Sequence, residues 1–424
     1  MSEEAMSNQN APHGPSPGGA SDNTKDGSAG ILPAEVGGKR AGRPRSLQKS
    51  PDDTLGGEAS FSEAPFRMAE GVMDMENPRT LGLKTLAFDT TMLYEARVGA
   101  SFSHHSGLAV FQDHLYCSWS GGKEMEDGAG QVVYYRRTAD GVHWSPLQVM
   151  ARPEGNDRLV AAGFLVAGDT LVAYHTRVLD YPVHNLRHPG TALYAMTSHD
   201  GERWSEPQRM AAGFFIEGPL RLPSGRLVMG GENTGSFDEH KIRMRMLYTG
   251  AQDGLSGWNV ADIHPELADP GGLRVFDYTE PCPFTRADGA VVTPFRNYSG
   301  ALYASTSRDE GASWSVPVRT NFPDSMARFS TGVLPDGRVW IINNPGPRRM
   351  NRQLLTLSLS DDGRVFDRAW LLRGEPTAMR FPGEAKGNGW QYPCARVWKN
   401  RLWISYSINK EDVAISNIPL ARLT

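Results

Sequence analysis

Apolar residues recur along the chain in short runs separated by turn-forming residues. Residues 106–111 and 114–120 form two such runs, joined by a two-residue turn. Runs of this length between Gly, Pro, Asn and Asp favour β-strands joined in hairpins. Equivalent hairpin turns follow later in the chain, at 223–226, 286–289 and 335–338. Helical periodicity is almost absent, so the pattern predicts an all-β protein built of antiparallel meanders.

One motif recurs at the turns and is clearest at residues 307–314, where Asp309 is followed by Gly311 and Trp314. An Asp carboxylate accepts hydrogen bonds from the backbone of its own turn, and Gly adopts the left-handed conformation of a tight hairpin. The Trp then returns the chain to apolar packing. Shorter or degenerate copies occupy residues 138–144, 198–204, 252–258 and 360–366.

The aromatic residues that close the five copies are 144, 204, 258, 314 and 366, at intervals of 60, 54, 56 and 52 residues. Near-regular copies indicate a repeat architecture, and each period suits one four-stranded propeller blade. The motif resembles the Asp-box, or BNR repeat, of the sialidase superfamily. This resemblance implies a six-bladed β-propeller in which Asp140, Asp200, Asp309 and Asp362 are structural turn residues and not catalytic ones.

Residues 1–60 differ from the rest in being rich in Gly, Pro, Ser, Asn and Asp with almost no aromatic residues. Such a segment cannot bury enough apolar surface to offset its ordering entropy, so we expect a disordered tail. Residues 61–82 are a transition, and the propeller is expected over 83–424. Because closure removes exposed sheet edges, we expect a strand near 83–88 to complete the last blade.

Composition narrows the function classes. A net charge of −4 and a pI near 6.3 do not suggest a nucleic-acid or membrane-surface partner. Neither a signal peptide nor a long apolar run is visible, so the default expectation is a cytoplasmic protein. No zinc-type spacing or phosphate-binding glycine loop occurs, so no metal or cofactor is expected. Three cysteines do not form a disulfide framework, and we expect small buried residues at Cys117, Cys282 and Cys394.

The sialidase resemblance implies a catalytic set on the strands nearest the axis. Glu280, which precedes a hairpin turn, matches the base that activates the nucleophile, and Arg296 follows that hairpin as in the family. Arg352 or Arg349, after an Asn-Pro loop, matches a second substrate-binding arginine, and the spacing does not separate them. Tyr392 matches the nucleophile; a sialic acid carries a carboxylate beside its anomeric carbon and would repel a carboxylate nucleophile.

The first blade departs from the family pattern. Its strand at 102–107 carries His104 and His105 where the family has an arginine of the carboxylate-binding triad. Arg97, just upstream, is a candidate substitute. Neighbouring residues of a strand point to opposite faces, so at most one of the two histidines is expected to face the axis. A histidine there suits acid/base chemistry near neutral pH.

The family's acid/base Asp has no clear match in this sequence. Asp127 is a candidate, as are Glu124 and Glu126 of the same polar loop. His175, in the next blade, is a further candidate for substrate binding.

These features predict a sialidase-like exo-glycoside hydrolase that cleaves a terminal acidic sugar from a glycan. One alternative is a His/Tyr-dependent polysaccharide lyase, or a non-sialic glycosidase, acting on sugars linked to uronic acids. Another is a non-catalytic propeller that binds a glycan or a protein. Fold does not decide among them, since propellers host many functions.

Overall fold

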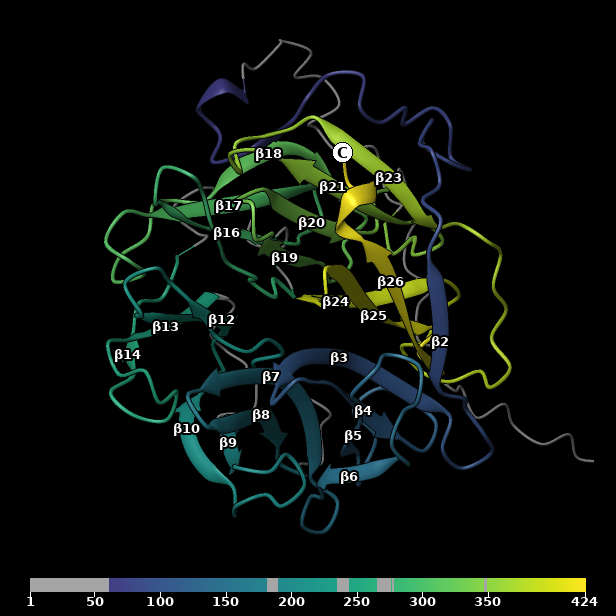
Figure 1. The fold of residues 1–424 in the computed structure, drawn as a ribbon, viewed down its shortest axis with the longest axis vertical. Helices are drawn as coiled ribbons and strands as arrows, with labels where there is room; N and C mark the ends of the chain where they lie inside the picture. The colour runs from purple at the N-terminus through teal and green to yellow at the C-terminus, as the bar shows by residue number, and fades with distance from the viewer. Residues whose placement is uncertain (1–60, 181–189, 235–243, 265–275, 277, 347–348) are drawn as a thin grey trace, which may run out of the picture. The chain divides into compact units, whose positions relative to one another are not determined.

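Six antiparallel four-stranded sheets follow one another along the chain and form the blades of a β-propeller (Figure 1). The computed structural model describes residues 61–180, 190–234, 244–264, 276, 278–346 and 349–424. The tail predicted for residues 1–60 lies outside the described residues. The prediction of six blades is confirmed.

The first three blades are sequential meanders of four strands each. The first contains β3 (Phe102–Phe111), β4 (His114–Gly122), β5 (Val132–Thr138) and β6 (Gln148–Ala151). The second contains β7 (Arg158–Ala167), β8 (Thr170–Val178), β9 (Ala192–Ser198) and β10 (Gln208–Ala212). The third contains β11 (Leu220–Arg221), β12 (Leu227–Glu232), β13 (Met244–Thr249) and β14 (Asn259–Val260).

The fourth and fifth blades keep this order, with one short strand inserted in the fifth. The fourth contains β15 (Phe284–Thr285), β16 (Val291–Phe295), β17 (Ala301–Ser307) and β18 (Val318–Pro323). The fifth contains β19 (Ser330–Val333), β20 (Val339–Asn343), β21 (Leu355–Ser360) and β23 (Arg368–Arg373). The inserted β22 (Val365–Phe366) pairs in parallel with β1 (Arg67–Met68), so the segment predicted as a transition contacts the fifth blade.

The sixth blade joins the two ends of the propeller. It contains β24 (Trp390–Trp398), β25 (Arg401–Ile408), β26 (Asp412–Pro419) and β2 (Asp89–Tyr94). The predicted closure by an early strand is confirmed, but the prediction of residues 83–88 was wrong, because β2 is the strand that pairs antiparallel with β26. Thr85 of the predicted segment makes only an isolated bridge to Leu371.

Helical structure among the described residues is limited to 3₁₀ turns such as η2 (Phe61–Glu63) and η5 (Leu420–Arg422). No helix in the described part of the chain has the length and apolar character needed to cross a membrane.

The hydrophobic core is divided among the interfaces between neighbouring blades. Leu159 and Phe164 of the second blade, for example, pack with Phe111 of the first, and Leu402 of the sixth packs with Leu357 of the fifth. All three cysteines are buried and free, as expected from the sequence. Because every blade is stabilised by its two neighbours, closure of the ring contributes directly to the core.

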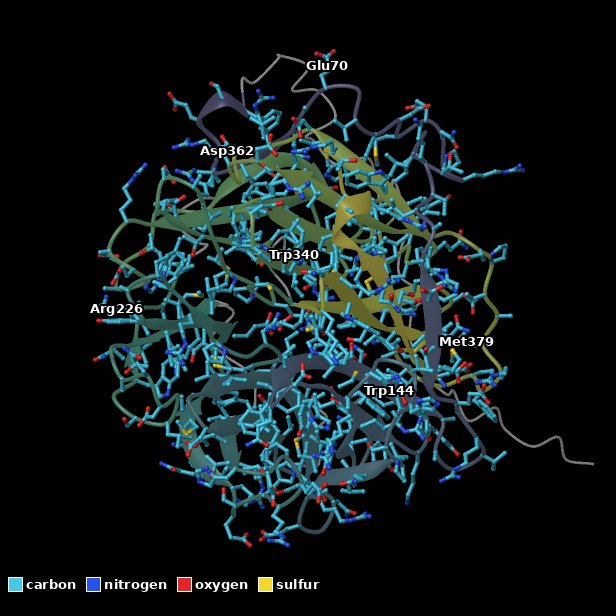
Figure 2. All side chains as sticks on the ribbon, viewed as in Figure 1. Glu70, Trp144, Arg226, Trp340, Asp362 and Met379 are labelled. Carbon is cyan, nitrogen blue, oxygen red and sulfur yellow. The ribbon has the colours of Figure 1, made fainter. Side chains whose placement is uncertain are left out.

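The Asp-box turns have the predicted construction. The carboxylate of Asp140 accepts backbone N–H bonds of 2.8 Å from both Val142 and His143, and Gly141 has a φ of 82°. Each closing aromatic residue packs against the core between its own blade and the preceding one; Phe366 is fully buried and Trp144 is half-buried. Figure 2 shows Asp362 toward the outside of the ring, away from its centre. These turns therefore build the scaffold.

Candidate active site

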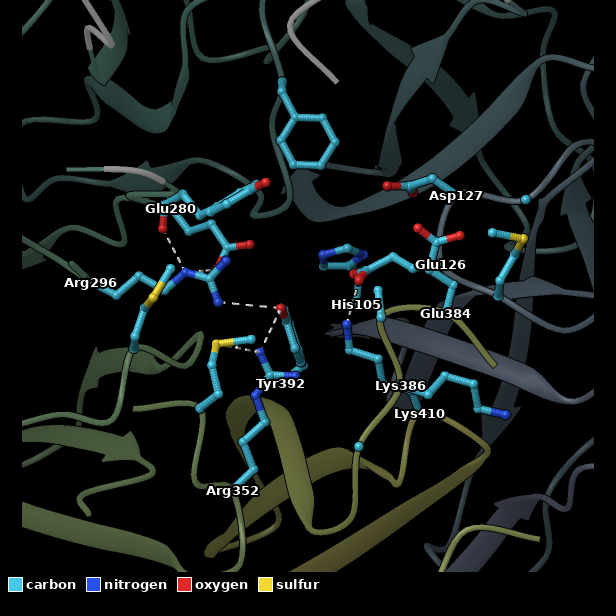
Figure 3. A pocket seen from close by; sticks show the side chains of 18 of the residues that line it. His105, Glu126, Asp127, Glu280, Arg296, Arg352, Glu384, Lys386, Tyr392 and Lys410 are labelled. Carbon is cyan, nitrogen blue, oxygen red and sulfur yellow. Dashed lines mark hydrogen bonds and ion pairs between the residues drawn. The ribbon is translucent and has the colours of Figure 1, made fainter. Parts of the chain in front are cut away.

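A cavity of about 590 Å³ lies where loops and inner strands of several blades converge (Figure 3). Most residues singled out from the sequence line it: His105, Asp127, Glu280, Arg296, Arg349, Arg352 and Tyr392. They come from sequence positions almost 300 residues apart, so the propeller brings together groups that are unconnected along the chain.

Tyr392 lies at the start of β24, where an irregularity in the pairing with β25 follows Gln391. Its backbone has a φ of 55°, and its side chain is 2% exposed. The phenol oxygen accepts hydrogen bonds from Arg296 Nη1 at 3.3 Å and from Arg352 Nη2 at 3.5 Å. A buried phenol between two guanidinium groups is therefore at the centre of the site.

Glu280 and Arg296 form a buried ion pair, with Glu280 Oε2 2.9 Å from Arg296 Nε. Burial raises the pKa of Glu280 to about 7, although the charge of Arg296 acts in the opposite direction. Burial also acts to lower the pKa of Arg296, but the negative charge of Glu280 holds it above its usual value. Arg296 thus stays charged, and Glu280 can exchange a proton near neutral pH.

The structure distinguishes Arg352 from Arg349, which the sequence spacing could not do. Arg352 donates a 2.6 Å hydrogen bond to Gln391 Oε1, which directs its guanidinium toward Tyr392. Arg349 instead lies over the ring of Tyr298, with 3.8 Å between its guanidinium carbon and the ring centroid. Arg352 therefore contacts the central tyrosine, whereas Arg349 forms part of the cavity wall.

Both adjacent histidines of β3 approach Tyr392, although His105 lines the cavity and His104 does not. A β-bulge between His104 and Gly107, together with a φ of 50° at His105, interrupts the strand alternation. The Tyr392 ring centroid lies 3.8 Å from that of His104 and 5.1 Å from that of His105. Burial and neighbouring positive charges hold the pKa of each imidazole well below its usual value.

Asp127 lines the cavity and is 3% exposed. Burial, with a further contribution from Glu126, raises the pKa of Asp127 to about 7. Of the other two acids in this loop, Glu126 also lines the cavity, whereas Glu124 is exposed and does not. Asp127 is therefore a carboxyl group that is partly protonated at neutral pH.

Arg97 and His175 are not among the cavity-lining residues. Arg97 is exposed, in a turn bridged to Ala100 before β3. His175 lies on β8, the second strand of its blade and one step farther from the axis than β7. Its ring stacks on Tyr194, and burial lowers the pKa of His175 to about 4.

Sequence reasoning missed Lys410, Lys386 and Glu232, which also line the cavity. Lys410 follows Asn409 in the turn between β25 and β26, and both have positive φ. A Lys in such a turn normally indicates an exposed hairpin, so the local sequence carries no signal of its burial. Glu232, at the end of β12, accepts hydrogen bonds from the hydroxyl of Thr279 and from the backbone N–H of Glu280.

Several cavity residues other than glycine have positive φ: His105, Asp127, Tyr278, Glu280 and Tyr392. Each such conformation costs free energy and persists only where the surrounding structure imposes it. Their concentration around one cavity supports a functional requirement for the positions of these side chains.

His104, His105 and Glu126 place potential ligand atoms within 4.8 Å of one another, a grouping that could hold a metal ion. However, Lys410 Nζ lies 2.5 Å from Glu126 Oε2. A divalent ion on this carboxylate would be repelled by the adjacent ammonium. We therefore assign the cationic position beside Glu126 to Lys410.

The solved structures that match this chain are propellers of the same kind. A protein titled sialidase aligns with a TM-score of 0.60 at 18% identity, over 84% of this chain and 35% of that one. Trypanosoma rangeli sialidase with the inhibitor DANA aligns with a TM-score of 0.61 at 11% identity, over 80% and 61%. A Dyadobacter fermentans protein of unknown function aligns with a TM-score of 0.57 at 13% identity, over 77% and 98%.

This chain thus spans about a third of the first sialidase and about three fifths of the trypanosomal one. No curated protein matches the sequence. The model of the BNR repeat-like domain matches residues 113–404, which is more than half of the chain. The chain therefore belongs to the BNR repeat-like family and has the six-bladed fold of the sialidases.

Proposed function

We propose that this protein is an exo-acting glycoside hydrolase that removes a terminal acidic sugar from a glycan. The observation that carries the proposal is the arrangement of Tyr392 within hydrogen-bonding distance of Arg296 and Arg352, with Glu280 ion-paired to Arg296. This arrangement combines a nucleophile, a base and two fixed positive charges in one cavity.

The charges indicate the class of sugar. Two guanidinium groups offer bidentate, permanently charged donors that suit a carboxylate. A sugar carboxylate held there, next to the anomeric carbon, would repel an Asp or Glu nucleophile. A neutral phenol avoids this repulsion, and Glu280 is the base available to activate it.

In the proposed reaction, the Tyr392 oxygen attacks the anomeric carbon while Glu280 accepts the phenolic proton. Asp127, whose raised pKa leaves it partly protonated, donates a proton to the departing glycosidic oxygen. Water then attacks the glycosyl–tyrosine intermediate and gives a proton to Asp127, and the phenolate recovers its proton from Glu280. Two displacements at one carbon retain its configuration.

The comparison structures support this class of chemistry. One matching structure of Trypanosoma rangeli sialidase is titled as a covalent intermediate with 2,3-difluorosialic acid, and another contains sialic acid. Their identities to this chain are 13% and 12%, and the proposal is tested directly on this chain.

That test is turnover of a fluorogenic sialoside and a fluorogenic glucuronide by the wild type and by Tyr392→Phe. We expect the wild type to cleave one of them and Tyr392→Phe to lose about a thousandfold in kcat, because the ring remains but the nucleophilic oxygen is gone. Equal turnover by the two proteins would exclude the tyrosine mechanism, and sugar binding without turnover would indicate a binding protein.

One observation favours a second candidate, a His/Tyr-dependent lyase. The imidazoles of His104 and His105 lie against Tyr392 and, with lowered pKa values, are neutral bases at physiological pH. A lyase acting on a uronic-acid polysaccharide would release an unsaturated product that absorbs in the ultraviolet. A hydrolase produces no such absorbance, so one spectrum of the digest separates the two reactions.

A further inference from the structure

Two lysines line the cavity, but their hydrogen bonds differ. Lys386 Nζ donates to the backbone carbonyls of Ser101 at 3.0 Å and Phe381 at 2.5 Å, and lies 3.3 Å from Glu411 Oε1. An ammonium has three donors, so Lys386 is fully paired. Within the described residues, the hydrogen bond recorded for Lys410 goes to Glu126 Oε2, at 2.5 Å. Lys410 therefore keeps donor capacity for another acceptor.

Lys410 also lies where a bound anion would need it. Its ammonium is 5.2 Å from the ring centroid of Tyr392, while the guanidinium carbons of Arg352 and Arg296 are 5.1 Å and 5.9 Å from the same point (Figure 3). The three side chains are 2%, 5% and 4% exposed, and all line the cavity. Lysines are rarely buried to this degree without a partner or a function.

The histidines cannot replace this charge. His104 and His105 are neutral near pH 7, first because they are buried and then because positive groups, Lys410 among them, surround them. Of the positive groups that surround them, Lys410, Arg296 and Arg352 line the cavity, and Lys410 lies beside β3, because its backbone carbonyl accepts a hydrogen bond from the Ser103 N–H. Glu126 Oε1 lies 3.1 Å from His104 Nδ1, and Glu126 Oε2 binds the ammonium of Lys410. Glu126 therefore holds this ammonium on the side of the cavity formed by β3.

We propose that Lys410 is the third anion-binding group of this cavity and binds the acidic group of the sugar together with Arg296 and Arg352. This inference rests on the proposed function for the sugar-acid class of the ligand. An ammonium is a compact point donor without the planar fork of a guanidinium. Lys410 is therefore expected to contribute to recognition of negative charge more than to the orientation of the carboxylate plane.

The experiment compares each acid with its neutral methyl ester. Dissociation constants of sialic acid, glucuronic acid and their methyl esters are measured by calorimetry for the wild type, Lys410→Met and Lys386→Met. We expect the wild type to prefer one acid over its ester, and Lys410→Met to reduce that preference about tenfold through weaker binding of the acid. Lys386→Met is the matched control and should lower the melting temperature without changing the preference.

A second variant keeps the proposal testable if Lys410→Met does not fold. Glu126→Gln removes the carboxylate that neutralises Lys410 but keeps an oxygen acceptor, so the preference for the acid should increase. Equal weakening of acid and ester by Lys410→Met, or an unchanged preference in Glu126→Gln, would overturn the proposal. No acid preference in the wild type would overturn it too.

The outcomes also separate this proposal from the proposed function. In one outcome, binding of the acid depends on Lys410 but neither fluorogenic substrate is cleaved. This outcome would contradict hydrolysis and would still support the proposed anion site. In another outcome, cleavage depends on Tyr392, but Lys410→Met weakens binding of the acid and the ester equally. This outcome would contradict only the proposed role of Lys410.

Discussion

The carboxylates of the Asp-box turns and those of the axial cavity have opposite environments. Hydrogen bonds from the His143 ring and from the N–H groups of His143 and Val142 hold the pKa of Asp140 below its usual range. Burial instead raises the pKa values of Asp127 and Glu280 to about 7. The Asp-box carboxylates, which recur in every copy of the repeat, are therefore permanently ionised groups of the scaffold. The carboxyl groups that can exchange protons, Asp127 and Glu280, each occur once and lie outside the repeat.

The largest expected effect is that of Glu280→Gln, which keeps the shape of the side chain and removes its charge. We expect kcat to fall by a factor of about 10²–10⁴, because the base that accepts the phenolic proton is lost. Removing one partner of a buried ion pair also costs about 3–5 kcal/mol, since Arg296 stays charged and buried. Kinetics and thermal unfolding measured on the same sample give the two effects separately.

Unchanged turnover in a folded Glu280→Gln protein would remove Glu280 from the mechanism. It would also mean that the raised pKa of Glu280 marks only a buried structural acid, which would weaken the contrast with the Asp-box turns.

Asp127→Asn tests the other raised pKa through stability. A carboxyl whose folded pKa is about 7, against about 4 when unfolded, loses stability as pH rises between these values, because the unfolded chain releases its proton more easily. Asp127→Asn should therefore be more stable than the wild type at pH 8, by up to about 4 kcal/mol, and similar to it at pH 4. Melting temperatures across this range measure the difference.

Asp324→Asn is the matched control for this variant. Burial also raises the pKa of Asp324 to about 7, but this residue does not line the cavity. Both substitutions should stabilise the protein at high pH, and only Asp127→Asn should also slow turnover. If both slow it equally, Asp127 has no specific part in the reaction.

The smallest effect is expected for Asp309→Ala in the clearest Asp-box turn. Asp309 accepts hydrogen bonds from the backbone N–H of Ser313 and from the hydroxyl of Ser307, all within one hairpin. Their loss should lower the melting temperature by about 2 °C and leave kcat/KM unchanged. A large loss of activity would show that the turns and the cavity are coupled after all.

The same contrast explains what the sequence could predict. The hydrogen bonds of the Asp-box turns join residues two to four positions apart. The local sequence, such as that of Asp140, Gly141 and Trp144, is therefore enough to predict the structure of the turn. Five such turns at near-regular intervals predicted the four-stranded blade and the number of blades. The closing strand lies one segment later than predicted, because residues 89–94, which are of mixed polarity, are the ones that pair with β26.

The site was only partly predictable, because its contacts are distant in sequence. Arg296 and Tyr392 are 96 positions apart, and Lys410 and Glu126 are 284 apart. A family resemblance led to Tyr392 and the two arginines. Nothing local indicated that a bulge would turn both His104 and His105 toward Tyr392, or that a hairpin lysine would be buried beside them.

The pairing of β2 with β26 has a consequence for biosynthesis. Thr90 and Ser416, which share a hydrogen bond across these strands, are 326 positions apart. At about 5–20 residues per second, a ribosome needs roughly 20 s to a minute to make the intervening chain. For that time the nascent β2 strand lacks its partner and exposes an edge that other chains can pair with. This edge therefore needs protection until translation is almost finished.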